Sequence, residues 1–304
     1  MSYSDSHLTA SYNRPPSGVM IRKVSNYELN LEEILWEMVG EFRLRVHDKT
    51  VLIKPNFVDA DAKGFVDTHP AVIRALRETF LRLGARKIVI AEGPSHERDT
   101  ESIVETLRLR EHIGSLEGTF VDLNLDEVSK VPTRTRASKL KELCLPRTVL
   151  GADFVVSAPK MKTHHWSGVT LSLKNMFGII PGSCYGWPKN ILHWAGISNS
   201  ILDVNSTVRP DFAIVDGIVG MEGNGPLQGV PKNCGVLVAG NDPVAVDATC
   251  ARIMGIEPER VDHLKRAGLL LGNLDEGKIH QLGELIAEVR NPFEVLPTFQ
   301  GLRM

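Results

Sequence analysis

Residues 51–56 read VLIKPN, and this short stretch decides the fold class. Three consecutive apolar residues, 51–53, are typical of a strand buried in a parallel sheet. Pro55 ends the strand because proline has no N–H to donate to a neighbouring strand. A helical pattern follows from Pro70 and closes at Gly84, and residues 87–91 are again strand-like. A strand, a helix and a second strand in this order predict a crossover unit and a parallel sheet.

The same alternation recurs along the rest of the chain. Further strands are expected at residues 19–24, 153–157, 211–216 and 235–239, and further helices at residues 30–42, 243–254 and 258–267. The sequence therefore predicts a layered α/β fold with a mostly parallel sheet and crossover helices. Residues 1–18 are expected to form a disordered tail. Residues 19–304 are expected to form the α/β domain, either undivided or split into lobes of about 19–150 and 151–304 with a pocket between them.

Length and charge exclude several classes of protein. The chain has 304 residues, enough for one large α/β domain or two lobes. Its 35 basic and 37 acidic residues argue against a protein that binds nucleic acid by bulk charge. No stretch approaches the roughly 20 apolar residues that span a bilayer, and residues 1–18 lack the apolar segment of a secretory signal. We therefore expect a cytoplasmic protein whose partners include neither nucleic acid nor a membrane.

The four cysteines follow no metal or cluster pattern. Cys144, Cys184, Cys234 and Cys250 lie far apart, and no C-x-x-C pair occurs. Zinc knuckles and ferredoxin-type clusters need closely spaced cysteines. The sequence therefore predicts free thiols and no intrinsic iron–sulfur cluster.

Residues 154–202 contain no acidic residue, although charged residues make up 24% of the chain. The basic residues of this interval are Lys160, Lys162, Lys174, Lys189, His164, His165 and His193. A charge-poor segment rich in histidine and tryptophan is a poor solvated surface, so it is either core or pocket lining. Lysines in such surroundings bind anions or act as bases, and imidazoles move protons. We predict that His164, His193 and Lys174 converge as catalytic residues in one pocket, with Lys160, Lys162 and Asn175 binding the ligand beside them.

Other candidate residues follow the predicted strands, at the edge of the sheet where α/β proteins bind ligands. Lys54 and Asn56, with Thr68 at the next helix start, are suited to hold a carboxylate or phosphate. For Thr68 alone, a plain N-cap is the favoured interpretation. Asp216 ends a predicted strand and is a further binding candidate.

A glycine-rich loop after Asp216 contains Glu222, Gly223 and Asn224. Such a loop either lets backbone N–H groups approach a ligand, as in phosphate-binding loops, or is a simple turn. Glu222 is suited to balance the lysines or to bind a metal ion. Asp247 lies among apolar residues of a predicted helix, and a buried carboxylate there needs a partner such as a pocket lysine.

These motifs together resemble the domain-of-unknown-function (DUF) 362 family. The matching segments are residues 51–56, 68–70, 159–164, 173–178, 181–182, 215–226 and 242–247, with His193 between them. The resemblance implies no particular activity. Many members of that family carry a four-cysteine iron–sulfur module, and this chain lacks such a cysteine run.

A second resemblance is to the nickel-pincer lactate racemases. His164, Gly168, Lys174, the pair Pro181-Gly182 and His193 occur in the order found in that family's central segment. The resemblance implies that the two histidines are an acid/base pair and that Lys174 holds a cofactor. The paired glycines that precede the family's lysine are replaced here by Ser172-Leu173, which argues against the pincer cofactor itself.

Three functions remain open from the sequence. The first is an enzyme, isomerase- or oxidoreductase-like, that acts on a small anionic substrate by His/Lys acid–base chemistry. The second is a redox accessory protein that uses an external electron carrier, such as a ferredoxin-like iron–sulfur protein. The third is a non-catalytic protein that binds a small molecule or a metal. The cofactor, either a metal ion or an organic molecule, and the oligomeric state are left open.

The cysteine pattern generates a direct prediction. Purified protein is expected to contain no stoichiometric iron or acid-labile sulfide, because four scattered thiols cannot readily converge on one cluster. Elemental analysis together with a sulfide assay checks this. About four iron atoms and four sulfides per chain would contradict it.

Overall fold

A computed structural model describes residues 14–60, 63–94 and 99–304. Residues 1–13, which include most of the predicted tail, lie outside the described residues. Arg14 donates hydrogen bonds to the carbonyl oxygens of Gly268 and Gly272. The first strand begins at Ser17, two residues before the strand expected from the sequence.

Ten of the described strands form one sheet and two form a separate hairpin. The strands are β1 (Ser17–Lys23), β2 (Thr50–Pro55), β3 (Lys87–Glu92), β4 (Phe120–Asp122), β5 (Val128–Pro132), β6 (Glu142–Pro146), β7 (Phe154–Ala158), β8 (Lys160–His164), β9 (Gly168–Thr170), β10 (Phe212–Glu222), β11 (Val230–Gly240) and β12 (Ile279–Gly283). The main order is β12-β1-β11-β10-β7-β2-β3-β4, and β8 pairs with both β10 and β9. Strands β10, β7, β2, β3 and β4 run parallel, whereas β11 is antiparallel to its two neighbours. The predicted α/β class with a large, mostly parallel sheet is confirmed.

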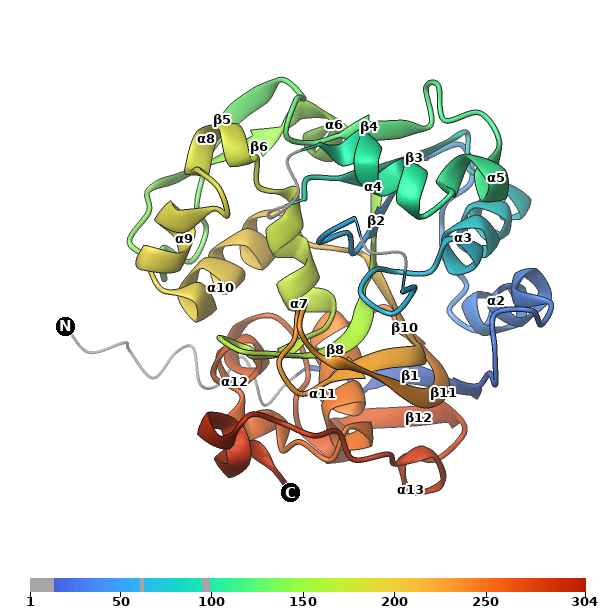
Figure 1. The fold of residues 1–304 in the computed structure, drawn as a ribbon, viewed down its shortest axis with the longest axis vertical. Coiled ribbons are helices and arrows are strands. Elements are labelled where there is room, and N and C mark those ends of the chain that lie inside the picture. The colour runs from blue at the N-terminus through green and yellow to red at the C-terminus, as the bar shows by residue number, and fades with distance from the viewer. Residues whose placement is uncertain (1–13, 61–62, 95–98) are drawn as a thin grey trace.

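Helices cover both faces of this sheet (Figure 1). They are α2 (Leu31–Gly40), α3 (Pro70–Arg82), α4 (Thr100–Thr106), α5 (Leu109–Ile113), α6 (Arg147–Leu150), α7 (Ser172–Asn175), α8 (Gly182–Tyr185), α9 (Asn190–Trp194), α10 (Ile197–Thr207), α11 (Pro243–Ile253), α12 (Asp262–Leu270) and α13 (Ile286–Val289). None of the described helices is both long and apolar enough to cross a lipid bilayer.

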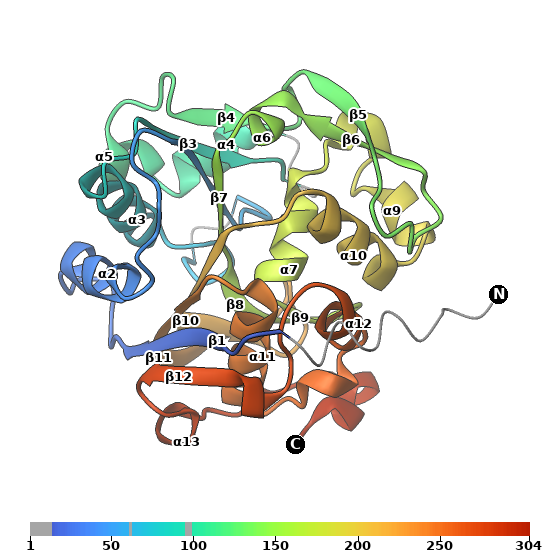
Figure 2. The same ribbon diagram turned by 180° about the vertical axis from the view of Figure 1, so that it is seen from behind.

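Side-chain alternation along the strands separates the core into two layers. In β2, Val51 and Ile53 pack in the layer with α2, α3, α4 and α5. Leu52 points the other way and packs in the layer with α7, α10, α11 and α12. Figure 2 shows α7 and α10 from behind, on the side of the sheet opposite α3.

Two predicted strand ends are wrong. Residues 160–164 form β8 instead of a terminal loop, and β10 continues to Glu222 instead of ending at Asp216. Both extensions occur because β8 and β10 pair with each other, Asp216 opposite Lys160. The glycines of the motif allow this approach, since a Cβ at Gly220 would lie 2.7 Å from the carbonyl oxygen of Met161. The helix predicted at 258–267 is also displaced, because a 3₁₀ turn (Pro258–Arg260) precedes α12.

A buried ion pair joins β8 to β10. Lys160 Nζ lies 2.7 Å from Asp216 Oδ2, and both side chains are 0% exposed. Asp216 also accepts hydrogen bonds from the Tyr27 hydroxyl (3.0 Å) and the His69 backbone N–H (3.0 Å). The carboxylate therefore ties the segment before α2 and the start of α3 to the sheet. Lys160 and Asp216 neutralise each other's charge without a ligand. We therefore interpret both as structural residues.

Asp216→Asn is expected to lower the free energy of unfolding by about 3–5 kcal/mol, because Lys160 would stay buried without a counter-charge. Glu37→Gln, which breaks the exposed pair of Glu37 with Arg22, is the matched control and should cost less than about 1 kcal/mol. Urea denaturation of both variants measures the difference. Similar small losses in both would show that the sheet does not depend on the buried pair.

Candidate functional site

A cavity of about 80 Å³ lies beyond the carboxyl ends of β2 and β3. Six of the residues predicted for the site line it: Lys54, Asn56, His164, Lys174, Asn175 and His193. They come from β2, the segment after it, β8, α7 and α9. Parallel strands end at one edge of a sheet, so residues far apart in the chain meet there.

The floor of the cavity is a second buried ion pair. Lys54 Nζ lies 2.6 Å from Glu92 Oε2, and both side chains are at most 1% exposed. The same ammonium donates to the Pro55 carbonyl and to Asn175 Oδ1, each at 2.8 Å. Burial lowers the pKa of Lys54, and the charge of Glu92 opposes that shift. A side chain at Gly178 would collide with both partners, so this position needs glycine.

Helix α7 is held in place by polar contacts at both of its ends. Asp247 of α11 accepts hydrogen bonds from the backbone N–H groups of Ser172 (2.7 Å) and Leu173 (2.8 Å). At the other end, Asn175 Nδ2 donates to the Lys54 carbonyl at 3.0 Å. The hydrogen-bond partners of Asp247 are therefore backbone amides, and the expectation of a lysine partner is wrong. Its role is to position α7, which carries Lys174.

Two further lysines add positive charge around the cavity. Among the described residues, Lys174 Nζ has no hydrogen-bond or ion-pair partner and lies 4.6 Å from the centre of the Phe177 ring. Burial, reinforced by the charge of Lys54, lowers the pKa of Lys174 to about 8. Lys189 is fully buried and donates to the Gly93 carbonyl at 2.8 Å. Burial lowers the pKa of Lys189 to about 7.

These charges favour a negatively charged ligand. Within the described part of the chain, Glu92 is the only carboxylate that lines the cavity, and Lys54 already pairs with it. The charge of Lys174 is left without a counter-ion. A partly buried, unpaired ammonium is costly for the fold, and an anion bound beside it would remove that cost.

The backbone assigns opposite tautomers to the two histidines. His164 Nδ1 accepts hydrogen bonds from the N–H groups of Trp166 (3.0 Å) and Ser167 (3.3 Å), so the proton of the ring is on Nε2. Burial lowers the pKa of His164 well below its usual value, so the ring is neutral. His193 Nδ1 lies 3.0 Å from the Lys189 carbonyl oxygen, which can only accept. Nδ1 of His193 is therefore the donor, and its Nε2 carries the lone pair.

A row of aromatic rings joins the two histidines. His164 stacks on His165 with ring centres 5.0 Å apart, and His165 contacts Trp166 at 4.8 Å. Trp166 in turn meets the ring of His193 edge-on at 4.8 Å. Each of these rings also lines the cavity.

Two lining residues carry buried polar atoms without a partner. Asn56 Oδ1 and Thr170 Oγ1 have no hydrogen bond to any described residue. Buried polar atoms are normally satisfied, so these two oxygens are available for a hydrogen bond to a ligand or an ordered water.

Several predicted binding residues lie outside the cavity. Lys162 donates to the Val66 carbonyl at 2.7 Å, and burial lowers its pKa to about 7, against the opposing charge of Asp67. Thr68 Oγ1 donates to the Ala158 carbonyl at 2.7 Å. The N-cap of α3 is His69, so the N-cap interpretation of Thr68 is wrong.

The glycine-rich motif also lies away from the cavity lining, except at Pro226. Glu222 pairs with Lys232 at 3.2 Å and accepts the N–H of Glu294. Gly223 donates its N–H to the Glu294 carbonyl, and Asn224 donates to Gln228. Contacts of β10 with neighbouring segments thus account for these residues. In the described ranges, no three His, Cys, Asp or Glu side chains converge to hold a metal ion.

Sequence reasoning did not select Glu92 and Thr170, which line the cavity, or Lys189, which binds carbonyl oxygens of lining residues from behind the cavity wall. A signal existed for Glu92, because it ends the apolar strand run of residues 88–91. Lys189 lies in the acid-free interval and could have been singled out there. Nothing local distinguishes Thr170 from an ordinary strand residue.

Comparisons with known proteins agree with the motif pattern. The model of a family described as "Domain of unknown function (DUF362)" matches residues 51–252, a range that includes all six predicted residues lining the cavity. A thylakoid-associated protein of Synechocystis sp. is 27% identical over 221 residues, which are 69% of this chain and 64% of that relative. The chain thus spans just under two thirds of the relative's length.

Lys174→Met is expected to leave the melting temperature unchanged or raised while abolishing anion binding in the central cavity, because the variant keeps the stem and removes an unpaired charge. The folded-state pKa of about 8 lies below the value of about 10.4 for an unfolded lysine. The wild type therefore becomes more stable as the pH rises from about 8 to 10, since the unfolded chain binds more protons there.

The variant should lack this part of the rise, so the stability difference between the two proteins should shrink above pH 8. Thermal denaturation at pH 7 to 10 and calorimetric titration with lactate and phosphate measure both effects. A large loss of stability with anion binding in the central cavity retained would show that Lys174 is structural.

Proposed function

We propose that this chain, which belongs to the DUF362 family, is an enzyme that moves a proton on a small carboxylate- or phosphate-bearing substrate. The observation that carries the proposal is the unpaired ammonium of Lys174 in a cavity with two histidines of opposite tautomer. An anion site beside one proton acceptor and one proton donor is suited to acid–base catalysis.

Binding begins with charge. The anionic group of the substrate pairs with Lys174, which raises the pKa of that lysine back toward its usual value. Hydroxyl groups of the substrate are suited to donate to Asn56 Oδ1 and to pair with Thr170 Oγ1, the two partnerless oxygens. Lys54 stays bound to Glu92 and keeps the cavity floor rigid.

Proton transfer then divides between the histidines. His193 Nε2 takes a proton from the carbon next to the carboxylate, and the electron pair of the broken C–H bond moves into the carboxylate group. His164 donates a hydrogen bond from Nε2–H to the oxygen on which charge develops, as a neutral electrophile. Return of a proton from His193 to the same face restores the substrate, with its hydrogen exchanged for one from solvent. Protonation of the opposite face by water, after which His193 releases the first proton to solvent, completes an isomerisation. The order of His164, Lys174 and His193 along the chain, which resembles that of the racemases, supports a similar pocket rather than a shared reaction.

The free thiols of the chain fit a reducing compartment, and we propose the cytoplasm. The molecule would act there on a metabolite of low molecular mass, because the cavity volume is only about 80 Å³.

Hydrogen–deuterium exchange tests the proposal. The protein is incubated in D₂O with a panel of small 2-hydroxy acids, and proton NMR follows loss of the signal from the carbon-bound proton next to the carboxylate. His193→Gln is expected to slow exchange by about 100-fold or more, since it removes the base, and to change anion affinity much less. His280→Gln, an exposed position on β12, is the control and should exchange like the wild type.

Unchanged exchange in His193→Gln would remove His193 from the mechanism. Anion binding without exchange of any substrate in the panel would instead favour the non-catalytic binding function.

A further inference from the structure

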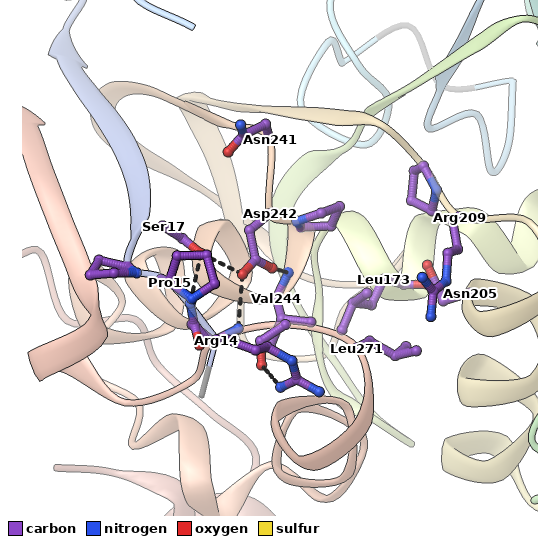
Figure 3. Close-up of a pocket in the computed structure, with 15 residues that line it drawn as sticks. Arg14, Pro15, Ser17, Leu173, Asn205, Arg209, Asn241, Asp242, Val244 and Leu271 are labelled. Atoms are coloured by element: carbon purple, nitrogen blue, oxygen red, sulfur yellow. Dashed lines mark hydrogen bonds between the residues drawn. The ribbon is translucent and has the colours of Figure 1, made fainter. Parts of the chain in front are cut away.

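A second and larger pocket, of about 350 Å³, lies on the helical layer that contains α10, α11 and α12. It is bounded by the start of β1, the first turn of α11 and the ends of α10 and α12 (Figure 3). Helix α7 separates it from the central cavity, because Leu173 lines this pocket and Lys174 lines the cavity. No residue is shared between the two linings.

In one half of the pocket, the polar side chains already make hydrogen bonds within the protein. Asp242 accepts hydrogen bonds from Ser17 Oγ (2.7 Å), from the N–H of Asn273 (2.8 Å) and from the N–H of Val244 (3.0 Å). The Arg14 guanidinium donates to carbonyl oxygens at the end of α12. These contacts fix the walls and leave little hydrogen-bonding capacity for a ligand on this side.

The opposite half, at the end of α10, contains polar groups that make no hydrogen bond within the described chain. Asn205 is 2% exposed, and its Nδ2 donates to the carbonyl oxygens of Leu173 and Ile201, each at 2.8 Å. These two acceptors fix the orientation of the amide, and Asn205 Oδ1 has no partner among the described residues. Arg209 follows the end of α10 and is exposed, and its guanidinium has no hydrogen bond or ion pair within the described chain. Figure 3 labels both residues on the α10 side.

The net positive charge of the pocket favours a negatively charged ligand. The pocket contains Arg14 and Arg209 against the single carboxylate Asp242. Hydrogen bonds to neutral carbonyl groups leave the charge of Arg14 in place, so one positive charge is uncompensated. Burial lowers the pKa of Arg14, Asp242 opposes the shift and Arg209 adds to it, which places the two guanidinium groups in each other's field. Guanidinium groups bind carboxylates and phosphates through paired hydrogen bonds.

We propose that this pocket is a second ligand site, for a small phosphate or carboxylate that also carries a hydroxyl group. Arg209 binds the oxyanion, and the hydroxyl group donates to Asn205 Oδ1. Leu173, Val244 and Leu271 form the apolar wall against which the carbon skeleton packs. The site lies outside the central cavity and is independent of the proton transfer proposed there.

Calorimetric titration of the Lys174→Met protein tests the site, because that variant lacks the anchoring charge of the central cavity. The probes are glycerol 3-phosphate, glycerate and methyl phosphate. Glycerol 3-phosphate or glycerate should bind at one site per chain, and the comparison of the two identifies the oxyanion. Methyl phosphate, which has no hydroxyl group, should bind severalfold more weakly than glycerol 3-phosphate, since it leaves Asn205 Oδ1 without a partner.

Arg209→Gln in the same background should weaken binding by about tenfold or more, the effect of losing one charge-assisted contact. Arg45→Gln, an exposed arginine outside the pocket, is the matched control for charge and should bind like its parent. The same pair of substitutions in the otherwise wild-type chain repeats the comparison without relying on the fold of Lys174→Met.

Absence of saturable binding by both hydroxylated probes, or equal weakening by Arg209→Gln and Arg45→Gln, would overturn the second site. Equal affinity for methyl phosphate and glycerol 3-phosphate would overturn the role of Asn205. Proton exchange in Arg209→Gln should equal that of the wild type. Failure of the second site therefore leaves the proposed activity standing, and failure of exchange leaves the second site standing.

Discussion

The carboxyl edge of the sheet depends on the buried ion pair between Lys54 and Glu92. The two residues end neighbouring parallel strands, and the ammonium also binds Asn175 of α7. Charges so fully removed from water are stable only when each finds its partner and its hydrogen bonds. The pair therefore links the ends of β2 and β3 and holds α7 against them through Asn175, and it excludes a side chain at Gly178. The candidate cavity is the space left above this contact.

The chain places more positive charge at this edge than the ion pair balances. Burial lowers the pKa of Lys174 and of Lys189, which means that the folded state opposes their protonation. A sequence selected for stability alone would replace Lys174 by an apolar residue, whereas functional sites commonly retain such costs. The two histidines are constrained by hydrogen bonds to the backbone. These contacts place the ring proton on Nε2 of one histidine and on Nδ1 of the other. The proposed anion binding and proton transfer rest on this unpaired charge and on these proton positions.

Much of the candidate site could be predicted from the interval without acidic residues, residues 154–202. His164, Lys174 and His193 belong to it, and they line one cavity with Lys54 and Asn56, which follow a predicted strand. The same reasoning selected Lys160, Lys162 and Asp216, which are buried elsewhere in contacts between β8, β10 and their neighbours. Residue type and order along the chain cannot separate these two groups. Lys160, Lys162 and His164 share one face of β8, so side-chain alternation does not separate them either. Only the tertiary structure shows which segments pack over each part of the strand and which of these side chains meets the cavity.

The sequence by itself determined the α/β class, the order of the main strands and helices and the edge of the sheet where a site would form. Local patterns suffice for these features, since apolar periodicity, proline and glycine act within a few residues of chain. The tertiary structure alone decided that Glu92 pairs with Lys54, that Asp247 holds the start of α7 and that the two histidines carry opposite tautomers. Each of these depends on atoms that the backbone brings together, in most cases from distant segments. Contact geometry, which local propensity does not encode, therefore determines the chemistry of the site.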